Sequence, residues 1–326
     1  MQRKKFLFYA VGIFVSYFYF GILQEKVTRG KYQREVENGG VKSTEVEKYT
    51  FAVTLVFVQC VINTIVAKVA ITIWPQTEDK TPKLYYASMS TTYLLAMICS
   101  NMALQWVSYP TQVIGKSAKP IPVMILGVLL GRKKYTFRKY IFVCMIVFGI
   151  VLFMLKDKNM SAAQDNLIGV GELLLLLSLL MDGLTGAIQE RIRAESKPSG
   201  LDMMFHGNIW STLFLAVTLV LSGEYVKFYE FSRYYPFVIN NLFLLGIMSS
   251  IGQLFLYSMV SEFGPLVLSV VTTTRKFFTV LASVILFGNA LSPKQWIGTV
   301  IVFAALFLDT FYSKAPPKKR NNFRTP

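Results

Sequence analysis

Four basic residues lie inside two segments that are otherwise apolar enough to span a membrane. Lys116 and Lys119 are in the first segment, and Arg275 and Lys276 are in the second. A charged side chain at this depth costs ~2.5–3.5 kcal/mol on insertion scales, so four unpaired ones would cost roughly 10–14 kcal/mol. An anion that neutralises them offsets this cost. We therefore predict that the segments bind an organic anion and carry it across a membrane.

The local sequence around the two lysines favours a cavity. Lys116 and Lys119 are three residues apart and share one face of a helix, and Gln112 precedes Lys116 by four residues and joins that face. Pro120 and Pro122 follow, and each removes a backbone donor and frees carbonyl groups. Non-helical backbone at membrane depth is tolerated where protein or a cavity covers it.

The second basic pair has the chemistry of a phosphate site. Arg275 and Lys276 are neighbours, about 100° apart on a helix, so both reach one cavity only if it is wide or if one side chain bends or pairs. Arginine offers a planar fork that fits phosphate oxygens, and lysine a compact charge. Thr272 and Thr279 add hydroxyl groups. The predicted ligand is a polyanion with two or three phosphates.

The alternative is that these cations pair with buried acids. Only Asp182 lies deep in an apolar segment, because Glu25, Glu172 and Asp309 are nearer the segment ends. One deep carboxylate cannot neutralise four cations, although Glu25 could reach one lysine. The anion site is therefore the favoured interpretation, and the ion-pair interpretation stays open.

Uncharged polar residues inside the apolar segments could shape the same cavity. Asn101 with Gln105, and Gln253 with Tyr257, are spaced four residues apart, and Asn63 stands alone. Such residues more often form hydrogen bonds between helices than contacts with a ligand. We include Gln253 and Tyr257 among the candidate binding residues. A base could stack on an aromatic side chain, but the sequence does not select which one.

The elements that position these residues are long apolar helices. The chain has 326 residues, is 53% hydrophobic and has a mean hydropathy of +0.46. Apolar runs of about 20 residues recur along it, which predicts an all-α, polytopic membrane protein. We expect ten spans, at residues 6–24, 51–74, 84–107, 111–131, 139–155, 168–189, 204–222, 237–260, 264–288 and 294–312.

An internal repeat relates the two basic segments. Pro110 and Pro265 open them, and Lys139 and Lys294 begin the spans that follow; both pairs are 155 residues apart. The fourth span thus matches the ninth, and the fifth matches the tenth. The chain therefore divides into two halves of five spans each. Because five is odd, the second half enters the membrane from the opposite side and is inverted relative to the first. Inverted repeats that meet at a midplane binding site are a recurring transporter plan.

We therefore expect one transmembrane domain over residues 1–312, in which repeat 1 covers about 6–155 and repeat 2 about 168–312. Residues 313–326 form a basic tail that could touch membrane lipids. The mixed-charge segment 25–50 is expected to be a solvated, mobile connection.

The net charge of +16 does not indicate nucleic-acid binding, because most basic residues lie in short connections beside the spans. With both termini cytosolic, the cytosolic ends and loops hold 18 Lys and Arg residues and the opposite side 11. This bias supports cytosolic termini.

At this point the chain resembles a known family. The segments GKSAKPIPVM at 115–124 and TTTRKFFTVLASVILF at 272–287 resemble signature segments of the nucleotide-sugar transporters in the drug/metabolite transporter superfamily. YFYFGILQE at 17–25 resembles the B subfamily of solute carrier family 35. The resemblance covers residues 6–312, and it implies the ten-span fold of two inverted halves, alternating access and antiport. It also implies that the four cations bind phosphates.

Within that family the chain resembles members of the endoplasmic reticulum, which implies exchange of cytosolic ATP for lumenal ADP in that membrane. The alternative cargo is a UDP-sugar (UDP-galactose or UDP-glucose) exchanged for UMP, and the alternative location is the Golgi membrane. Phosphate-binding cations cannot distinguish adenine from uracil. A membrane transferase would need acids or histidines clustered on one membrane face, and the loops have none, so we expect no enzyme and no cofactor. The sequence leaves the oligomeric state open.

Overall fold

A computed structural model gives the structure of the chain. It describes residues 2–28, 30, 32–38, 41–47, 49–103, 106–107, 112, 115–130, 134–154, 169–286 and 293–312. Within these ranges some side chains are not described, and those of Glu25, Lys276 and Thr279 are among them.

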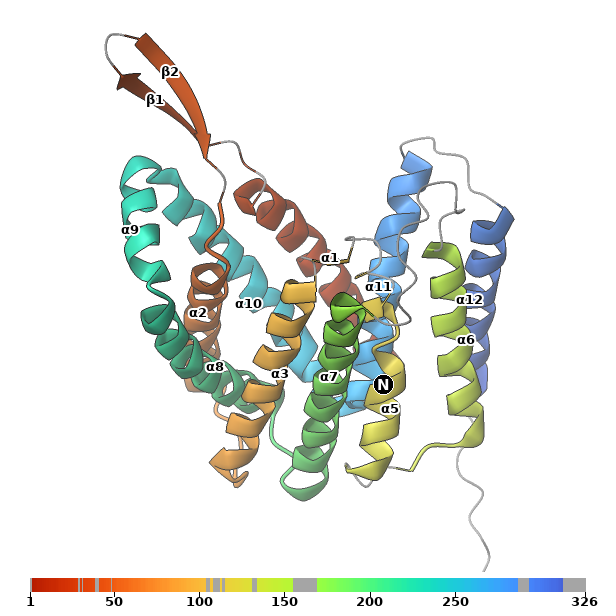
Figure 1. Ribbon diagram of the computed structural model, residues 1–326. Helices are drawn as coiled ribbons and strands as arrows, with labels where there is room; N and C mark the ends of the chain where they lie inside the picture. Colours follow the sequence, from red (N-terminus) through yellow and green to blue (C-terminus); the bar gives the residue numbers. More distant parts are fainter. Residues whose placement is uncertain are drawn as a thin grey trace, which may run out of the picture.

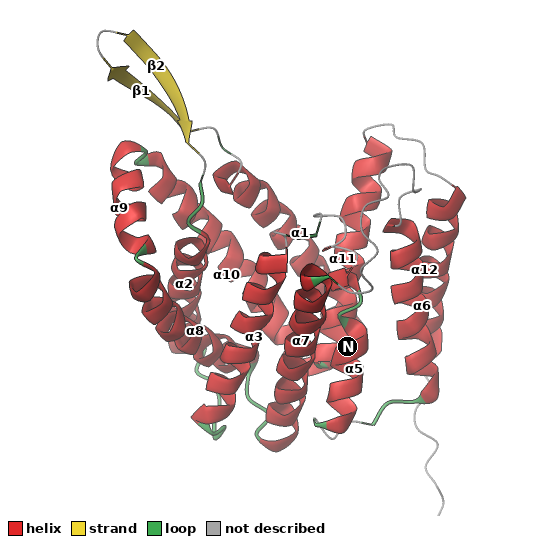
Figure 2. Ribbon diagram, in the orientation of Figure 1, coloured by secondary structure: helices red, strands yellow, loops and turns green. Residues whose placement is uncertain are grey.

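The described part of the chain is almost entirely helical (Figures 1 and 2). Each of the ten predicted apolar segments contains one described helix. The helices are α1 (Gln2–Thr28), α2 (Ala52–Ile73), α3 (Lys83–Ala103), α5 (Pro120–Leu129), α6 (Phe137–Met154), α7 (Val170–Glu195), α8 (Gly200–Ser222), α9 (Glu224–Tyr234), α10 (Phe237–Phe263), α11 (Pro265–Leu286) and α12 (Pro293–Tyr312).

Length and composition identify membrane spans among these helices. In the described residues, five helices are long and apolar enough to cross a membrane: α1, α2, α7, α8 and α10. Their outer faces are apolar too, since Leu7, Val11 and Val15 along α1 are 63%, 53% and 52% exposed. Exposed apolar stripes of this kind mark a surface that contacts lipid. That ten helices cross the membrane stays a prediction.

One expected span differs from the prediction. Residues 111–131 were expected to form a single span, but the structure turns at Ala118 and Lys119 before α5 begins at Pro120. The prolines cause the break, because Pro120 and Pro122 have no N–H to donate to a carbonyl one turn earlier. The opening residue Pro110 lies outside the described residues.

The segment 25–50 was expected to be a mobile connection, and it instead holds an antiparallel hairpin of β1 (Tyr32–Asn38) and β2 (Val41–Glu47). The hairpin projects beyond the helices in Figure 1. An aromatic cluster fastens its base, in which Tyr32 packs on Phe231 at a ring distance of 5.0 Å. The sequence prediction of an all-α fold is therefore correct for the helical body and wrong for this segment.

The same cluster accounts for α9, a short helix in the stretch between two predicted spans, 204–222 and 237–260. Gly223 adopts a left-handed conformation (φ 65°), which ends α8 and starts α9. Phe231 of α9 is buried, and its ring lies 5.1 Å from that of Phe51. The α9 helix thus packs one face on the hairpin base and on the start of α2.

Glycines set how closely the helices approach. A Cβ on Gly183 of α7 would lie 2.9 Å from the Pro122 carbonyl oxygen of α5, and one on Gly186 would lie 2.9 Å from Val123. Small residues of this kind let membrane helices approach closely. This close approach presses the lysine-bearing segment onto α7.

Candidate functional site

The lysine-bearing segment is held in a tight turn. The Lys119 N–H donates to the Lys116 carbonyl at 3.3 Å, and the Ile121 N–H donates to the Ala118 carbonyl at 3.0 Å. These bonds span three residues, which is the tighter spacing of a 3₁₀ turn. They satisfy carbonyls that the two prolines leave without a helical partner. The turn directs both lysine side chains toward α7.

Asp182 of α7 receives both lysines. Lys116 Nζ lies 2.5 Å from Asp182 Oδ2, and Lys119 Nζ lies 2.9 Å from Asp182 Oδ1. Lys116 also donates to Ser178 Oγ at 2.7 Å, and the Ser178 hydroxyl donates in turn to the Ala96 carbonyl. The Asp182 side chain is only 6% exposed. One carboxylate is therefore shared by two ammonium groups, which leaves a net charge of about +1 in this group.

The sequence favoured an anion site over ion pairing with a buried acid. For Lys116 and Lys119 the structure supports the alternative, because both are paired with the single deep carboxylate. Of the other two cations, the side chain of Lys276 lies outside the described residues. Arg275 lies on α11, and its guanidinium carbon is 5.2 Å from the centre of the Tyr17 ring of α1. Such a contact between a cation and an aromatic face is attractive.

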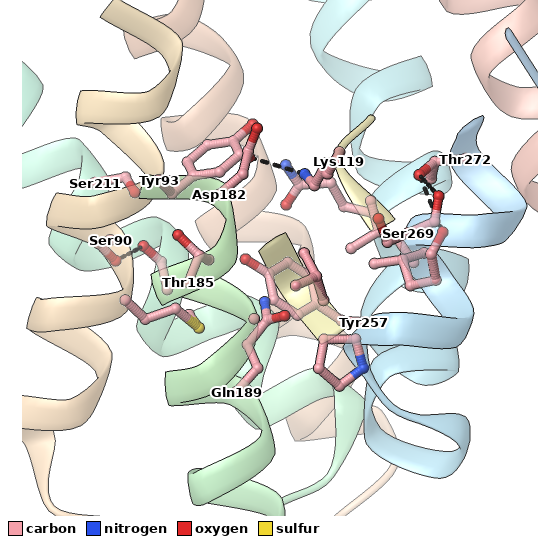
Figure 3. A pocket seen from close by; sticks show the side chains of 18 of the residues that line it. Ser90, Tyr93, Lys119, Asp182, Thr185, Gln189, Ser211, Tyr257, Ser269 and Thr272 are labelled. Carbon is pink, nitrogen blue, oxygen red and sulfur yellow. Dashed lines mark hydrogen bonds and ion pairs between the residues drawn. The ribbon is translucent and has the colours of Figure 1, made fainter. Parts of the chain in front are cut away.

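A central cavity of about 120 Å³ opens beside this ion-paired group. Figure 3 shows Lys119 and Asp182 at one side of it, joined by a dashed line. Four predicted binding residues line it: Lys119, Thr272, Gln253 and Tyr257. Lys116 and Arg275 do not, since Lys116 lies behind Asp182 and Arg275 behind Tyr17.

Several predicted site residues lie elsewhere or outside the described residues. Gln112 was expected to share the lysine face, but its Nε2 donates to the Ser100 carbonyl at 2.7 Å and to Ser100 Oγ at 3.0 Å. It therefore ties its own segment to α3 and is not among the cavity-lining residues. The side chains of Lys276, Thr279 and Glu25 lie outside the described residues.

The rest of the cavity wall combines apolar side chains, such as Met89 and Val123, with uncharged polar ones. The polar residues come from six helices (α1, α3, α7, α8, α10 and α11) and offer hydroxyls, amides and aromatic rings (Figure 3). The Ser269 hydroxyl is buried and has no hydrogen-bond partner among the described residues. The sequence did not single out the following cavity residues: Ser90, Tyr93, Thr185, Gln189, Asn208, Ser211 and Ser269.

A chain of amides borders the cavity. Asn63 Nδ2 donates to Asn208 Oδ1 at 3.2 Å, and Asn208 Nδ2 donates to Gln253 Oε1 at 2.8 Å. Ser250 closes the chain by donating to Asn63 Oδ1 at 2.7 Å. The expectation that Asn63 and Gln253 bond to other helices is confirmed. Because its oxygen is used by Asn208, Gln253 presents its NH₂ group as the remaining donor.

A second cavity of about 230 Å³ adjoins the first. Tyr17, Tyr93 and Gln253 line both cavities and so form the wall between them. Together the two cavities extend from Gln189 near the end of α7 to Gln24 near the end of α1.

Some of the missed residues carried a signal in the sequence. Asp182 is an acid in the middle of an apolar run, which is costly unless it is paired. The sequence offered pairing with the lysines only as an alternative interpretation, because Asp182 and Lys116 are 66 residues apart in the chain. Ser211 and Thr185, by contrast, are hydroxyl residues of a common kind in membrane helices, and nothing in the sequence sets them apart.

The chain is similar to proteins of one family. The profile of the UAA transporter family matches residues 5–313. A Drosophila melanogaster protein named "Solute carrier family 35 member B1 homolog" is 54% identical over 316 residues, which cover 97% of this chain and 93% of that protein. "Solute carrier family 35 member B1" of Bos taurus is 51% identical over 309 residues, 94% of each chain. A protein of known crystal structure, 11% identical, aligns with 94% of this chain and 96% of its own at a TM-score of 0.63, which indicates a similar fold.

Proposed function

Because the chain belongs to the UAA transporter family, we propose that it exchanges nucleotides across the membrane of the endoplasmic reticulum. The cargo is cytosolic ATP, which enters the lumen as ADP leaves. The family and the names of its relatives indicate a multi-pass membrane transporter rather than an enzyme. The observation that carries the nucleotide proposal is the central cavity with Lys119 in its wall.

The charges around the cavity fit a phosphate chain. Lys116, Lys119 and Asp182 together leave about one positive charge. Arg275 adds another behind the Tyr17 ring, where its field acts across the aromatic face. Lys119 would contact phosphate oxygens directly, and Ser269 on α11 would add a hydroxyl donor. The amide and aromatic groups of Gln253 and Tyr257 would then surround the rest of the nucleotide.

A UDP-sugar exchanged for UMP is the second candidate. The hydroxyl and amide groups of Ser90, Thr185, Gln189 and Ser211 favour it, because uncharged groups of this kind can hydrogen-bond a sugar. The phosphate contacts would be the same for either cargo. The base and the sugar therefore decide between the two.

Ligand competition on purified protein tests this proposal. We expect ATP and ADP to raise the melting temperature and to compete with labelled ATP for uptake into proteoliposomes, while UDP-glucose, UDP-galactose and UMP act weakly. A ligand at 100 times its dissociation constant stabilises a protein by ~2.7 kcal/mol. The reverse order would assign the UDP-sugar cargo. A melting temperature that none of the five ligands raises would contradict both candidates.

We also propose two inverted halves and alternating access, with α1, α2, α3, α5 and α6 corresponding to α7, α8, α10, α11 and α12. The helix contacts support this pairing. The contact of α3 with α7 then corresponds to that of α10 with α1, and the contact of α2 with α10 to that of α8 with α3. The pairs α2–α8 and α6–α12 map onto themselves. A two-fold axis relating the two halves would produce these matching helix contacts.

A polar cluster at the end of the bundle that holds the start of α1 supports alternating access. Arg193 of α7 pairs with Glu190 at 3.1 Å and donates to the carbonyls of Ser261 and Glu262 at the end of α10. Lys5 of α1 pairs with Glu262 at 3.1 Å. The cluster lies beside Gly264, since a Cβ there would be 2.6 Å from Glu190 Oε1. We propose that the cluster closes the cavity at this end and that this end is cytosolic, as both termini would be.

Replacing Arg193 with Ala should favour the state that is open at this end. The substitution removes contacts to α10, and a loss of one or two kcal/mol changes a two-state population roughly 5- to 30-fold. In protein without Cys60, Cys99 and Cys144, a cysteine placed at Gln189 should then react correspondingly faster with a membrane-impermeant maleimide applied to this side.

Arg191→Ala is the matched control for this measurement. Arg191 lies on the same helix and pairs with Glu195 at the exposed surface. It should leave the labelling rate unchanged. Equal rates in the Arg193→Ala and Arg191→Ala proteins would show that the cluster does not hold this end closed.

A further inference from the structure

The Asp182 carboxylate occupies the position that a substrate phosphate would need. Its Oδ2 accepts a hydrogen bond from Lys116 Nζ at 2.5 Å, and its Oδ1 accepts one from Lys119 Nζ at 2.9 Å. A phosphate group that bound both lysines would have to use the same two contacts. The site is therefore filled by an anion of the protein itself.

The two lysines are not equivalent in this arrangement. Lys116 is 16% exposed and is fixed by a second hydrogen bond, to Ser178 Oγ at 2.7 Å. Lys119 is 33% exposed and lines the cavity. An anion in the cavity reaches Lys119 first, while Lys116 stays with Asp182 behind it. Lys119 is the cation that can change partners.

We propose that Asp182 is a resident counter-ion that competes with the substrate for Lys119, and that this competition sets the affinity and the charge preference of the carrier. The inference rests on the nucleotide site described under the proposed function. The empty carrier keeps Lys119 paired with Asp182, and the loaded carrier pairs Lys119 with the ligand's phosphate. Asp182 is thus a positioning residue that acts through Lys119.

This competition has a defined effect on binding. When only a fraction of a protein is competent to bind, the apparent dissociation constant rises by the inverse of that fraction. A Lys119 that is held by Asp182 most of the time binds nucleotide correspondingly more weakly. The cost also depends on the ligand, because a more highly charged phosphate chain displaces a carboxylate more readily. The carrier then releases its cargo without a large barrier.

Asp182→Asn tests the proposal, since the amide keeps the shape of the side chain and removes its charge. We expect ATP to bind roughly 5- to 150-fold more tightly, which is the usual range for coupling between two ligands. The gain should rise from AMP to ADP to ATP. In proteoliposomes the KM for ATP should fall, and kcat should fall with it because the cargo leaves more slowly. Isothermal titration and labelled-ATP exchange measure the two effects.

Two variants separate this role from a purely structural bridge between α5 and α7. Asp182→Glu keeps the charge, so the ratio of ATP to AMP affinity should stay at the wild-type value. Glu195→Gln removes a carboxylate of the same helix that pairs with Arg191 at the exposed surface, and it should leave both affinities unchanged. A structural bridge would lose stability in Asp182→Asn without any change in the affinity ratio, which would overturn the proposal.

Poor folding does not prevent the test. If the Asp182→Asn protein needs a ligand to survive extraction, ATP should stabilise it at a lower concentration than AMP does. The ratio of the two concentrations should be larger for this variant than for the wild type. An equal ratio in the two proteins would overturn the proposal. Lys119→Ala distinguishes the two levels: unchanged ATP binding in this variant refutes the phosphate site itself. Lost binding in Lys119→Ala together with unchanged binding in Asp182→Asn refutes only the role of Asp182.

Discussion

Lys119→Ala should abolish nucleotide exchange while the protein stays folded. Lys119 is the described cation that lines the central cavity and can contact a phosphate directly. Truncating one partner of a buried charge pair typically costs 2–5 kcal/mol or more, which corresponds to about 30-fold or greater loss of binding. Asp182 keeps Lys116 on its other oxygen at 2.5 Å, so the substitution leaves no unpaired carboxylate in the membrane. Folding should therefore tolerate the change.

The measurement is uptake of labelled ATP into proteoliposomes preloaded with ADP. Lys68→Ala is the matched control, because Lys68 also lies within a membrane-spanning helix, α2, and is not among the cavity-lining residues. Its ammonium group lies 5.5 Å from the Phe205 ring centre. We expect the control to exchange at close to the wild-type rate. Wild-type exchange by a well-folded Lys119→Ala protein would rule out the phosphate role assigned to this lysine.

Gly298→Leu should prevent the packing of α6 against α12 and sharply lower the stability of the protein. A Cβ at Gly298 would lie 2.6 Å from the Gly149 carbonyl oxygen and 2.7 Å from the Phe153 backbone nitrogen. Both atoms are backbone, so no side-chain rotation can relieve the contact. The two helices would have to separate, and Phe153 and Val302, which are 1% and 0% exposed, would lose their packing.

Overpacking of a core typically costs 1–3 kcal/mol, and a backbone clash belongs at or above the upper end. At ~2–4 °C per kcal/mol for a domain of moderate size, the melting temperature should fall by about 6–12 °C or more. Gly21→Leu is the control, because nothing lies within 4 Å of the position of its Cβ. Thermal melting in detergent, with the yield of monodisperse protein, gives the answer. If both variants melt alike, the close approach of α6 and α12 does not contribute to stability.

The ion-paired site changes how exchange can be explained. Several cations facing one another in an empty cavity would repel, and that repulsion would oppose closing without cargo. The structure places Asp182 between Lys116 and Lys119, which removes most of the repulsion between these two. Whether the carrier closes more readily with cargo than without it then depends on the change of Lys119 from Asp182 to the phosphate. The charge of Arg275, which contacts the Tyr17 ring, also contributes.

The amino-acid sequence alone determined where the helices lie and that charge is placed inside them. Runs of about 20 apolar residues predict membrane helices because the bilayer core fixes their length, and this signal is local in the sequence. The two basic pairs stood out for the same reason, since the cost of a charge depends on its own apolar surroundings. The signature segments at 115–124 and 272–287 identified the family, which the matched profile confirms.

Only the tertiary structure decided which groups meet. Asp182 and the lysines are brought together by the close approach of α7 and α5 at Gly183, and the contact pairs residues 63 and 66 positions apart. Arg275 and Tyr17 are farther apart still, and they meet through the packing of α11 beside α1. Hydropathy says that a residue is buried but not which helix faces it. The partner of each buried charge, and hence which cation is left for a substrate, is fixed by helix packing rather than by the residues themselves.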